Sequence, residues 1–295
     1  MTLILVAVTG AARADEFRDE PDAHALYDGM LRALHDAKSL TFTSAYAWEA
    51  EGRELGQCTY RASLKKPNLF RLDTTREDGS AGGILVGDGE DLWIHWPGGR
   101  PSFNAEDEEK WRATSRNVYL TKPAPPGGHS IAHETPLLGA GMCMTILELS
   151  IFHGCAEALE PNLDGVRSVG TEEIRGETCD VIEVSYLRHQ RSRYYSLSRR
   201  DRLPRRLKEI VRVSYDITMR EEWSDVKVDG EIAADLFAWR PPEGWRRWQV
   251  PAPGDRLPKP GELAPPFRAR LADGSLLDSA DLRGRVVWLV FWRVG

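Results

Sequence analysis

The chain has 295 residues, of which 41% are hydrophobic and 28% charged, and its formal net charge at pH 7 is −6. This length allows one large domain or two ordinary ones, and the apolar fraction is sufficient for a hydrophobic core. The acidic balance argues against a nucleic-acid-binding protein, because such proteins carry a basic surface.

The first residues have the features of an export signal. An apolar run at Leu3–Val8 is followed by Ala-Arg-Ala at residues 12–14, which has the small-residue pattern of a cleavage site. We therefore predict a signal peptide over residues 1–14 and a periplasmic or otherwise exported protein. The basic residues that should precede the apolar run are missing, so we expect the true start upstream of Met1. The alternative is an ordinary frayed N-terminus. No other stretch approaches the roughly 18 apolar residues of a membrane span.

The next elements in chain order are a helix and a series of strands. Asp22–Ala37 carries Leu26, Met30 and Leu34 at helical spacing, which predicts an amphipathic helix. Period-two alternation then predicts short strands, each with one buried face. These strands are Leu40–Trp48, Gln57–Leu64, Leu69–Asp73, Gly83–Val86 and Asp91–Trp96.

The middle of the chain changes character before strands return. Asn104–Lys110 is polar and acidic, Lys122–Ser130 is a Pro/Gly-rich loop, and Thr135–Leu159 has an apolar pattern that predicts a helix. Four further strands are predicted at Cys179–Leu187, Arg193–Leu197, Leu203–Tyr215 and Asp216–Val228. Consecutive strands with short connections favour an antiparallel meander. A Pro-rich linker follows over residues 249–266.

Several phrases of the large region resemble the LolA-like family of periplasmic lipoprotein carriers. They are SLTFTSAYAWEAEG, YRASLKKPNLFRLD, LVGDGEDLWIHWPGGR, GTEEIRGETCDVIEVSY, LPRRLKEIVRVSYDI and LFAWRPPEGW, between Asp22 and Trp248. The resemblance implies a mainly β (α+β) domain over residues 15–248, an antiparallel half-barrel with helices in its mouth. It also implies that the domain shields a lipid, an acyl chain or another apolar small molecule from water.

Aromatic residues at inward strand positions are the candidates for binding such a ligand. A curved sheet with these side chains can leave a cavity for one lipid tail, and each CH₂ moved from water contributes about 0.8 kcal/mol. The alternative is that they form an ordinary core. The candidates are Phe42, Tyr46, Trp48, Tyr60, Phe70, Ile94, Trp96 and Trp223.

A basic cluster between Arg188 and Arg206 is a candidate docking patch. Its eight arginines and one aspartate give a local charge of +7. Such a cluster can dock on an anionic membrane surface or an acidic envelope protein. The alternative is the solvent face of two short strands. The arginines are Arg188, Arg191, Arg193, Arg199, Arg200, Arg202, Arg205 and Arg206.

Catalytic and metal-binding patterns are weak. Met142–Met144 with His153 and Cys155 offers soft metal ligands, but adjacent residues of a helix point about 100° apart, so helix core is favoured. His129 and His133 are one turn apart without the glutamate of H-E-x-x-H. No nucleophile elbow, P-loop or dinucleotide motif is present. We predict no metal, no cofactor and no catalytic residue, and leave open whether a longer parent protein is an enzyme.

The cysteines are compatible with an oxidising compartment. Cys58, Cys143, Cys155 and Cys179 are the four present, and four cysteines allow three pairings. None of their spacings is a Cys-x-x-Cys. A chain of this length does not need disulfides to fold, so buried free thiols are an equal alternative.

The end of the chain, GELAPPFRARLADGSLLDSADLRGRVVWLVFWRVG from Gly261, resembles the opening of TlpA-like and AhpC/TSA-type thioredoxin-fold proteins. In that family the active-site Cys-x-x-Cys follows the Phe-Trp pair within a few residues. Here Phe291-Trp292 is followed by three residues, and no cysteine lies beyond Cys179. The resemblance implies a redoxin-like segment over residues 267–295 without its active site.

Two interpretations of this ending are open. The segment can add to the large domain's sheet, or the chain can be a truncated version of a longer protein, which we favour. A longer parent would be a periplasmic thiol–disulfide oxidoreductase or peroxidase whose half-barrel recognises clients. Besides the carrier and the oxidoreductase, a third hypothesis for the function of the protein is an envelope-surface module that docks through residues 188–206.

Overall fold

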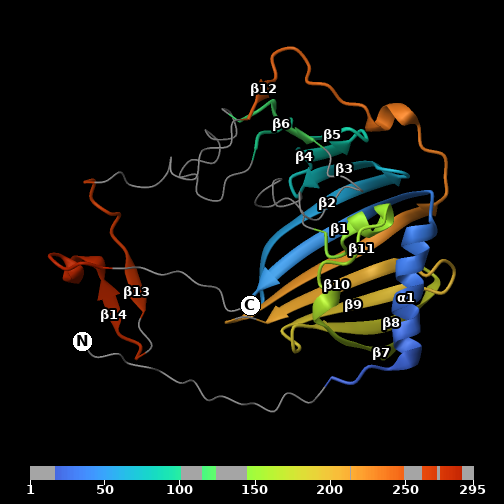
Figure 1. Ribbon diagram of the computed structural model, residues 1–295, viewed down its shortest axis with the longest axis horizontal. Helices are drawn as coiled ribbons and strands as arrows, with labels where there is room; N and C mark the ends of the chain where they lie inside the picture. The colour runs from blue at the N-terminus through green and yellow to red at the C-terminus, as the bar shows by residue number, and fades with distance from the viewer. Residues whose placement is uncertain are drawn as a thin grey trace. The chain divides into compact units, whose positions relative to one another are not determined.

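The structure, a computed structural model, describes residues 17–100, 115–123, 145–212, 214–248, 261–270 and 273–287. The chain divides into two compact units, Met1–Trp248 and Gln249–Gly295, and each is described by itself. Within the described residues, the first unit carries one large sheet and the second a two-stranded hairpin (Figure 1).

The described part of the first unit begins with a helix and continues mainly as strands. Its elements are α1 (Pro21–Asp36), β1 (Ser39–Ala50), β2 (Arg53–Lys65), β3 (Leu69–Arg76), β4 (Ala81–Gly87), β5 (Asp91–Trp96), β6 (Val118–Pro123), the 3₁₀ helices η2 (Leu149–His153) and η3 (Glu160–Asn162), β7 (Leu163–Ile174), β8 (Glu177–Tyr186), β9 (Arg191–Ser198), β10 (Pro204–Arg212), β11 (Asp216–Val228), η4 (Ala234–Phe237) and β12 (Arg246–Arg247).

One open sheet contains all twelve of these strands. Its order is β12-β6-β5-β4-β3-β2-β1-β11-β10-β9-β8-β7, and every pair is antiparallel except β12 with β6. The chain therefore runs outward from β1 to β6, crosses to the other edge, and runs inward from β7 to β11. The central pairing of β1 with β11 sets Tyr46 opposite Glu221 and Ser44 opposite Trp223.

The helix α1 packs on one face of the sheet through its apolar stripe. Pro21 occupies its first turn, where a missing N–H costs nothing, and Asp22 favours the positive end of the helix dipole. Tyr27, Met30 and Leu34 recur at helical spacing and are at most 3% exposed. The predicted helix over Asp22–Ala37 is therefore present, shifted by one residue.

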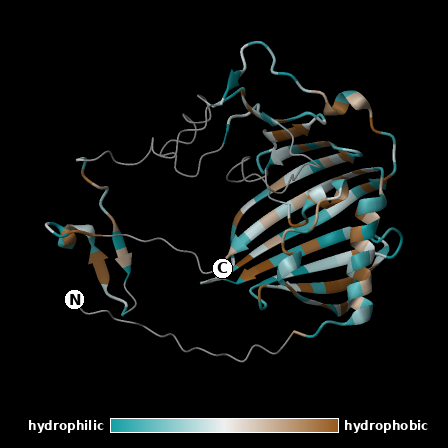
Figure 2. Cartoon of the chain, viewed as in Figure 1, coloured by the Kyte–Doolittle hydropathy of each residue, from teal (hydrophilic) through white to brown (hydrophobic). Residues whose placement is uncertain are grey.

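Alternation along the strands divides apolar from polar side chains. In β3, Phe70 and Leu72 are buried while Arg71 and Asp73 lie on the other face and form an ion pair. Figure 2 shows the resulting change between hydrophobic and hydrophilic residues along each strand. One face of the sheet is consequently a continuous hydrophobic core. The other face meets water over much of its area, but at β5 it is covered by Trp239, whose ring stacks on that of the buried His95 with centroids 4.1 Å apart.

The predicted fold class, a mainly β antiparallel half-barrel, is confirmed, and the sheet does not close. The expectation of several helices is corrected, because the described residues contain one α-helix. The predicted helix over Thr135–Leu159 is also wrong in its described part, where only the 3₁₀ helix η2 forms. Gly154, with a φ of 94°, ends it, and its apolar residues are buried on all sides instead of along one stripe.

The second unit contains a short hairpin. Strand β13 (Arg268–Arg270) pairs with β14 (Leu276–Asp278), and the side chain of Asp273 accepts from the backbone N–H of Ser275 at 2.9 Å in the turn between them. Gly274 adopts a φ of 83°, which favours glycine. Asp278 then caps the 3₁₀ helix η5 (Ser279–Leu282). The Phe291-Trp292 pair, which is part of the redoxin resemblance, lies outside the described residues.

Deleting the ring of Phe42 tests how much the fold depends on its core. Phe42 is 1% exposed, so we expect Phe42→Ala to lower the free energy of unfolding by about 3–5 kcal/mol. Leu55→Ala is the control, because Leu55 is 44% exposed and should change stability by no more than about 0.5 kcal/mol. Urea unfolding measures both, and equal losses would contradict this assignment of the core.

Candidate functional site

The face of the sheet that packs against α1 is the inner face, and it carries the predicted ligand-binding residues. The register of the strands puts all eight predicted side chains on it. Seven are at most 6% exposed, and the eighth is partly buried. They are Phe42, Tyr46, Trp48, Tyr60, Phe70, Ile94, Trp96 and Trp223. The structure therefore brings together the residues that sequence alternation selected.

These aromatic side chains pack closely against one another. The rings of Phe42 and Trp223 are stacked with their centroids 3.7 Å apart and their planes at 16°. Tyr60 meets Phe42 edge-on at 6.0 Å. Such pairs contribute beyond the area they bury. In the structure, the inner face is therefore a packed core.

Residues 145–162, here named the covering segment, lie on the inner face beside α1. The segment carries a run of apolar side chains that are no more than 5% exposed and belong to the same hydrophobic core as Phe42 and Met30. They are Ile146, Leu147, Leu149, Ile151 and Phe152. A short irregular segment thus covers apolar surface that a second sheet would cover in a β-sandwich.

A small number of polar contacts attach the covering segment to the sheet. His153 Nε2 lies 3.1 Å from the carbonyl oxygen of Leu69, and Lys66 Nζ donates to the carbonyl oxygen of Phe152. The backbone N–H of Ile146 donates to Glu221 Oε1 at 2.5 Å. At the end of the segment the backbone N–H of Leu187 donates to the carbonyl oxygen of Asn162 at 3.0 Å. The contacts that hold residues 146–153 to the sheet instead use side chains.

Glu221 is a buried carboxylate at the centre of the inner face. Besides Ile146, it accepts a hydrogen bond from Tyr60 Oη at 2.7 Å and from Trp223 Nε1 at 2.9 Å. Burial raises the pKa of Glu221 above its ordinary value of 4.5, although these hydrogen bonds act in the opposite direction. Glu221 therefore links β2, β11 and the covering segment, and the cost is the desolvation of its carboxyl group.

A second buried polar centre surrounds Arg193. Its Nε donates to Glu209 Oε1 at 2.6 Å, and its Nη1 donates to Glu157 Oε1 of the covering segment at 2.9 Å. The arginine side chain is 8% exposed, and the two carboxylates are 4% and 2% exposed. Burial disfavours the guanidinium charge, but Glu209 and Glu157 raise the pKa of Arg193, which therefore stays cationic.

Glu221 and Glu209, the buried glutamates on the inner face of the sheet described above, were missed as site residues. In β11, Glu221 shares a face with Met219 and Trp223, which lie two residues before and after it and belong to the buried side of the strand. In β10, Glu209 shares a face with the buried Leu207, two residues before it. A carboxylate at an inward position was the available signal. The third, Glu157, had no such signal, because its segment has no strand or helix periodicity.

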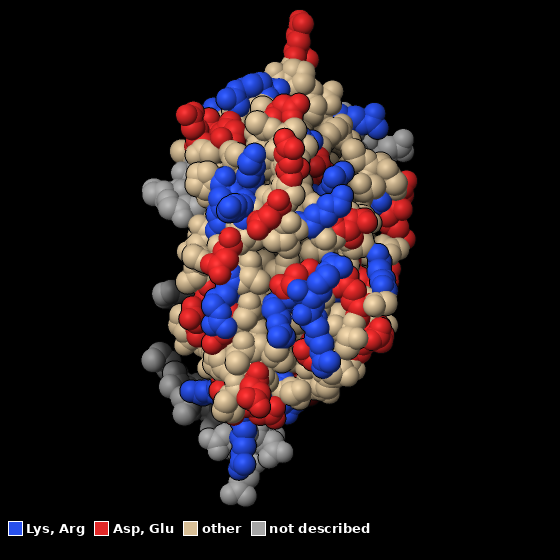
Figure 3. Space-filling view, turned by 90° about the vertical axis from the view of Figure 1, so that its right-hand side faces the viewer, with Lys and Arg blue, Asp and Glu red and all other residues tan. Residues whose placement is uncertain are grey.

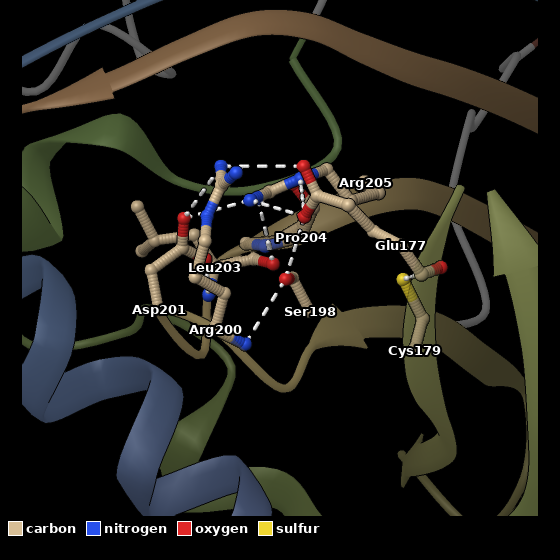
Figure 4. A network of polar contacts seen from close by, with 8 residues as sticks. All are labelled: Glu177, Cys179, Ser198, Arg200, Asp201, Leu203, Pro204 and Arg205. Atoms are coloured by element: carbon tan, nitrogen blue, oxygen red, sulfur yellow. Dashed lines mark hydrogen bonds and ion pairs between the residues drawn. The ribbon is translucent and has the colours of Figure 1, made fainter. Parts of the chain in front are cut away.

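The predicted arginine patch is corrected in two positions. Arg193 lies on the inner face, and Arg205 is held between Glu177 and Asp201 at 2.8 and 2.7 Å (Figure 4). Their side chains are 8% and 5% exposed, because each is surrounded by carboxylates on neighbouring strands and turns. Neither can contact a membrane or a partner from these positions.

The other six arginines remain closer to solvent, and most of them are paired. Arg199, for example, lies 2.6 Å from Asp180, and Arg191 lies 3.2 Å from Glu209. Arg188 is exposed and has no ion pair among the described residues. Figure 3 shows basic and acidic side chains interspersed over the side that carries α1. Docking through these six arginines remains a prediction.

The outer face has a hollow of about 340 Å³ over β1, β2 and β11. Its lining includes the small exposed Ala45 and the half-buried Ala47, with Arg220 and Glu222 to one side. Arg220 already forms two hydrogen bonds with Glu49, at 2.8 and 2.9 Å. The hollow is therefore open and internally charge-paired, unlike the apolar inner face.

No group of three or more potential metal ligands occurs among the described residues. The predicted ligand candidates Met142–Met144, His129 and His133 lie outside them, as does Cys143. Cys58, Cys155 and Cys179 are free thiols. Burial raises the pKa of Cys179 to about 11, which keeps it protonated. Within the part of the chain that is described, no helix is long and apolar enough to cross a membrane.

Comparison with known proteins gives no family for the chain. No family model matches it, and no curated protein matches it. A LolA superfamily protein from Nitrosomonas europaea is similar with a TM-score of 0.33 and 11% identity, covering 74% of this chain and 97% of that one. The Mycobacterium tuberculosis lipoprotein LppX has a TM-score of 0.38, 11% identity and coverages of 74% and 100%.

The complex of MucA and MucB from Pseudomonas aeruginosa is similar with a TM-score of 0.40 and 16% identity, covering 86% of this chain and 74% of that one. All three TM-scores lie below 0.5, so these similarities carry no argument about ligand or partner.

The opposite pKa shifts of Glu221 and its neighbour Glu222 predict opposite effects of pH on stability. A raised folded-state pKa gives stability that is present below pH 4.5 and lost as pH rises through the folded value. For Glu222, burial is outweighed by hydrogen bonds from Arg175 and Arg206, which lower the pKa below 4.5. Its contribution is present above pH 4.5 and lost as pH falls.

Urea unfolding of the wild type, Glu221→Gln and Glu222→Gln between pH 3 and 8 measures these contributions. We expect the stability difference between wild type and Glu221→Gln to decrease above pH 4.5, as Glu221 ionises. The difference between wild type and Glu222→Gln should decrease below pH 4.5. The same pH profile for both variants would contradict the burial of Glu221.

Proposed function

We propose that the first unit binds an apolar ligand, a lipid or the acyl chain of a lipoprotein, on the inner face of its sheet. The observation that carries this proposal is the way the face is closed. An extensive apolar surface on an open sheet is covered by one helix and an irregular segment that side-chain contacts attach. Exchange of this segment for a ligand requires no strand to leave the sheet.

Exchanging the covering segment for a ligand replaces one set of buried apolar groups with another of similar kind, so the free energies of the two forms can be close. The covering segment removes five large apolar side chains from water, and a ligand chain would replace them with CH₂ groups worth about 0.8 kcal/mol each. Local opening of weakly attached segments is the ordinary route by which binding surfaces become accessible. The closed structure is then the ligand-free form, in which the chain itself fills the site.

An exported location suits this function. The predicted signal peptide over residues 1–14 lies outside the described residues, and so its cleavage stays a proposal, as does a periplasmic site of action. An apolar ligand needs a carrier wherever it crosses an aqueous compartment. Docking of the six more exposed arginines on an anionic membrane surface or an envelope protein would bring the carrier to its donor or acceptor.

The redoxin-like segment adds no chemistry to this proposal. Its likeness to the start of a thioredoxin fold rests on the sequence resemblance, and no cysteine lies beyond Cys179. The described cysteines Cys58 and Cys179 are buried in the first unit. An oxidoreductase parent protein stays an alternative proposal. The intact mass of the native protein would show whether it is longer than this chain, and its sequence would show whether a Cys-x-x-Cys follows Phe291-Trp292.

Loosening the covering segment tests the carrier proposal. Leu149 is 1% exposed, and Leu149→Ala should weaken the packing of the segment on the sheet. A neutral pyrene-labelled dodecanol should bind the wild type saturably at one molecule per chain. It should bind Leu149→Ala more tightly by about tenfold, which corresponds to about 1.4 kcal/mol of the lost packing. Fluorescence titration measures both affinities.

Val169→Ala is the matched control, because Val169 is 53% exposed on β7 and away from the inner face. Its affinity for the probe should equal that of the wild type. Circular dichroism checks that each variant keeps its sheet. Absence of saturable binding to both wild type and Leu149→Ala would overturn the proposed function.

A further inference from the structure

The covering segment resembles the ligand that it would make room for. It combines a run of apolar side chains with two buried carboxylates, that of Glu148, which accepts from Ser150 and Ala158 within the segment, and that of Glu157, which the segment delivers to Arg193. An alkyl chain that ends in a carboxylate has the same two chemical parts. The segment therefore occupies the inner face as an acidic amphiphile would.

The position of Arg193 in the sheet makes it an unusual core residue. Cross-strand register places it between Val184 on β8 and Glu209 on β10, and the same row continues to Val166 and to Met219. A fixed cation thus lies in a row of apolar side chains on the face proposed to hold an apolar chain. Burial of a cation there has a high desolvation cost unless carboxylates face it.

Two carboxylates face this cation, and they come from different parts of the fold. Glu209 belongs to the sheet and stays with Arg193 whatever covers the inner face. Glu157 belongs to the covering segment and leaves with it. Arg191 also lies 3.2 Å from Glu209, so two arginines and two glutamates form a formally neutral group only while the segment is in place.

The contact of Glu157 with Arg193 is incomplete in the closed form. One oxygen, Oε1, accepts from Arg193 Nη1, while Oε2 is buried and has no hydrogen-bond partner among the described residues. A buried acceptor without a donor weakens the closed form. A carboxylate free to choose its orientation could engage the planar guanidinium with both oxygens, as arginine geometry favours.

We propose that Arg193 receives the carboxylate of an acidic amphiphile, such as a free fatty acid, and that Glu157 occupies this place in the closed form. This inference rests on the proposed function and adds the class of ligand. The apolar side chains of the inner face hold the alkyl chain, while Arg193 holds its charged end. Glu157 thereby acts as a built-in competitor that keeps the site closed without ligand.

The test compares two chain-matched probes at pH 8, pyrene-labelled dodecanoate and pyrene-labelled dodecanol. Wild type should bind the acid at least tenfold more tightly than the alcohol, the effect of one charge-assisted hydrogen-bonded pair. Glu157→Gln should tighten both probes by a similar factor, because it releases the covering segment and leaves Arg193 in place. Glu160→Gln is the matched control, an exposed glutamate of the same segment, and should change neither affinity.

Removing the cation should abolish the preference for the acid. The double variant Arg193→Met and Glu157→Gln removes one cation and one carboxylate with side chains of similar volume, and Glu209 stays paired with Arg191 at 3.2 Å. This variant should still bind the alcohol, and it should bind the acid no more tightly than the alcohol. Sodium acetate should not displace the acid from the wild type at equal concentration, because it has no chain.

The outcomes separate this inference from the proposed function. If neither probe binds wild type or Glu157→Gln, the proposed function fails and this inference fails with it. If both probes bind the wild type equally, or if the double variant keeps a preference for the acid, the carrier function stands and the role of Arg193 is overturned. Displacement of the acid by acetate alone would overturn the amphiphile in favour of a simple anion site.

Discussion

The structure depends on one constraint, the need to cover the apolar face of a wide open sheet. The strands present large apolar side chains on one face, and the described residues of the first unit contain no second sheet to cover them. The helix α1 covers the part near β7 and β8, and the irregular covering segment packs beside it. The same need that stabilises the fold therefore creates the replaceable surface on which the proposed function depends.

The ionisable side chains of Glu221 and Arg193 distinguish this apolar face from an ordinary hydrophobic core. A core optimised for stability alone would place well-packed apolar side chains where Glu221 and Arg193 lie, because a desolvated carboxyl group costs free energy and a buried ion pair contributes little net stability. Both groups instead contact the covering segment, through Ile146 and through Glu157. Their position at the boundary between the fixed sheet and its cover is the reason to assign them to function.

Much of the fold could be predicted from residue order. Alternation in β1, β2 and β11 placed Phe42, Tyr60 and Trp223 on a common face, and helical spacing located α1 within one residue. Prediction failed where periodicity carried no information. The apolar residues between 145 and 159 suggested a helix, since a segment buried on all sides has an apolar pattern as dense as that of a core helix.

By itself, the sequence determined the strand alternation, the antiparallel class of the sheet and the set of aromatic side chains that share its inner face. Those properties follow from periods of two and 3.6 residues, which are local. Only the tertiary structure decided that Arg193 and Arg205 are buried while the other arginines of the basic cluster are not, and that Glu157 meets Arg193 across 36 residues of chain. Contacts between distant segments depend on how the chain crosses from β6 to β7, and no local pattern records that crossing.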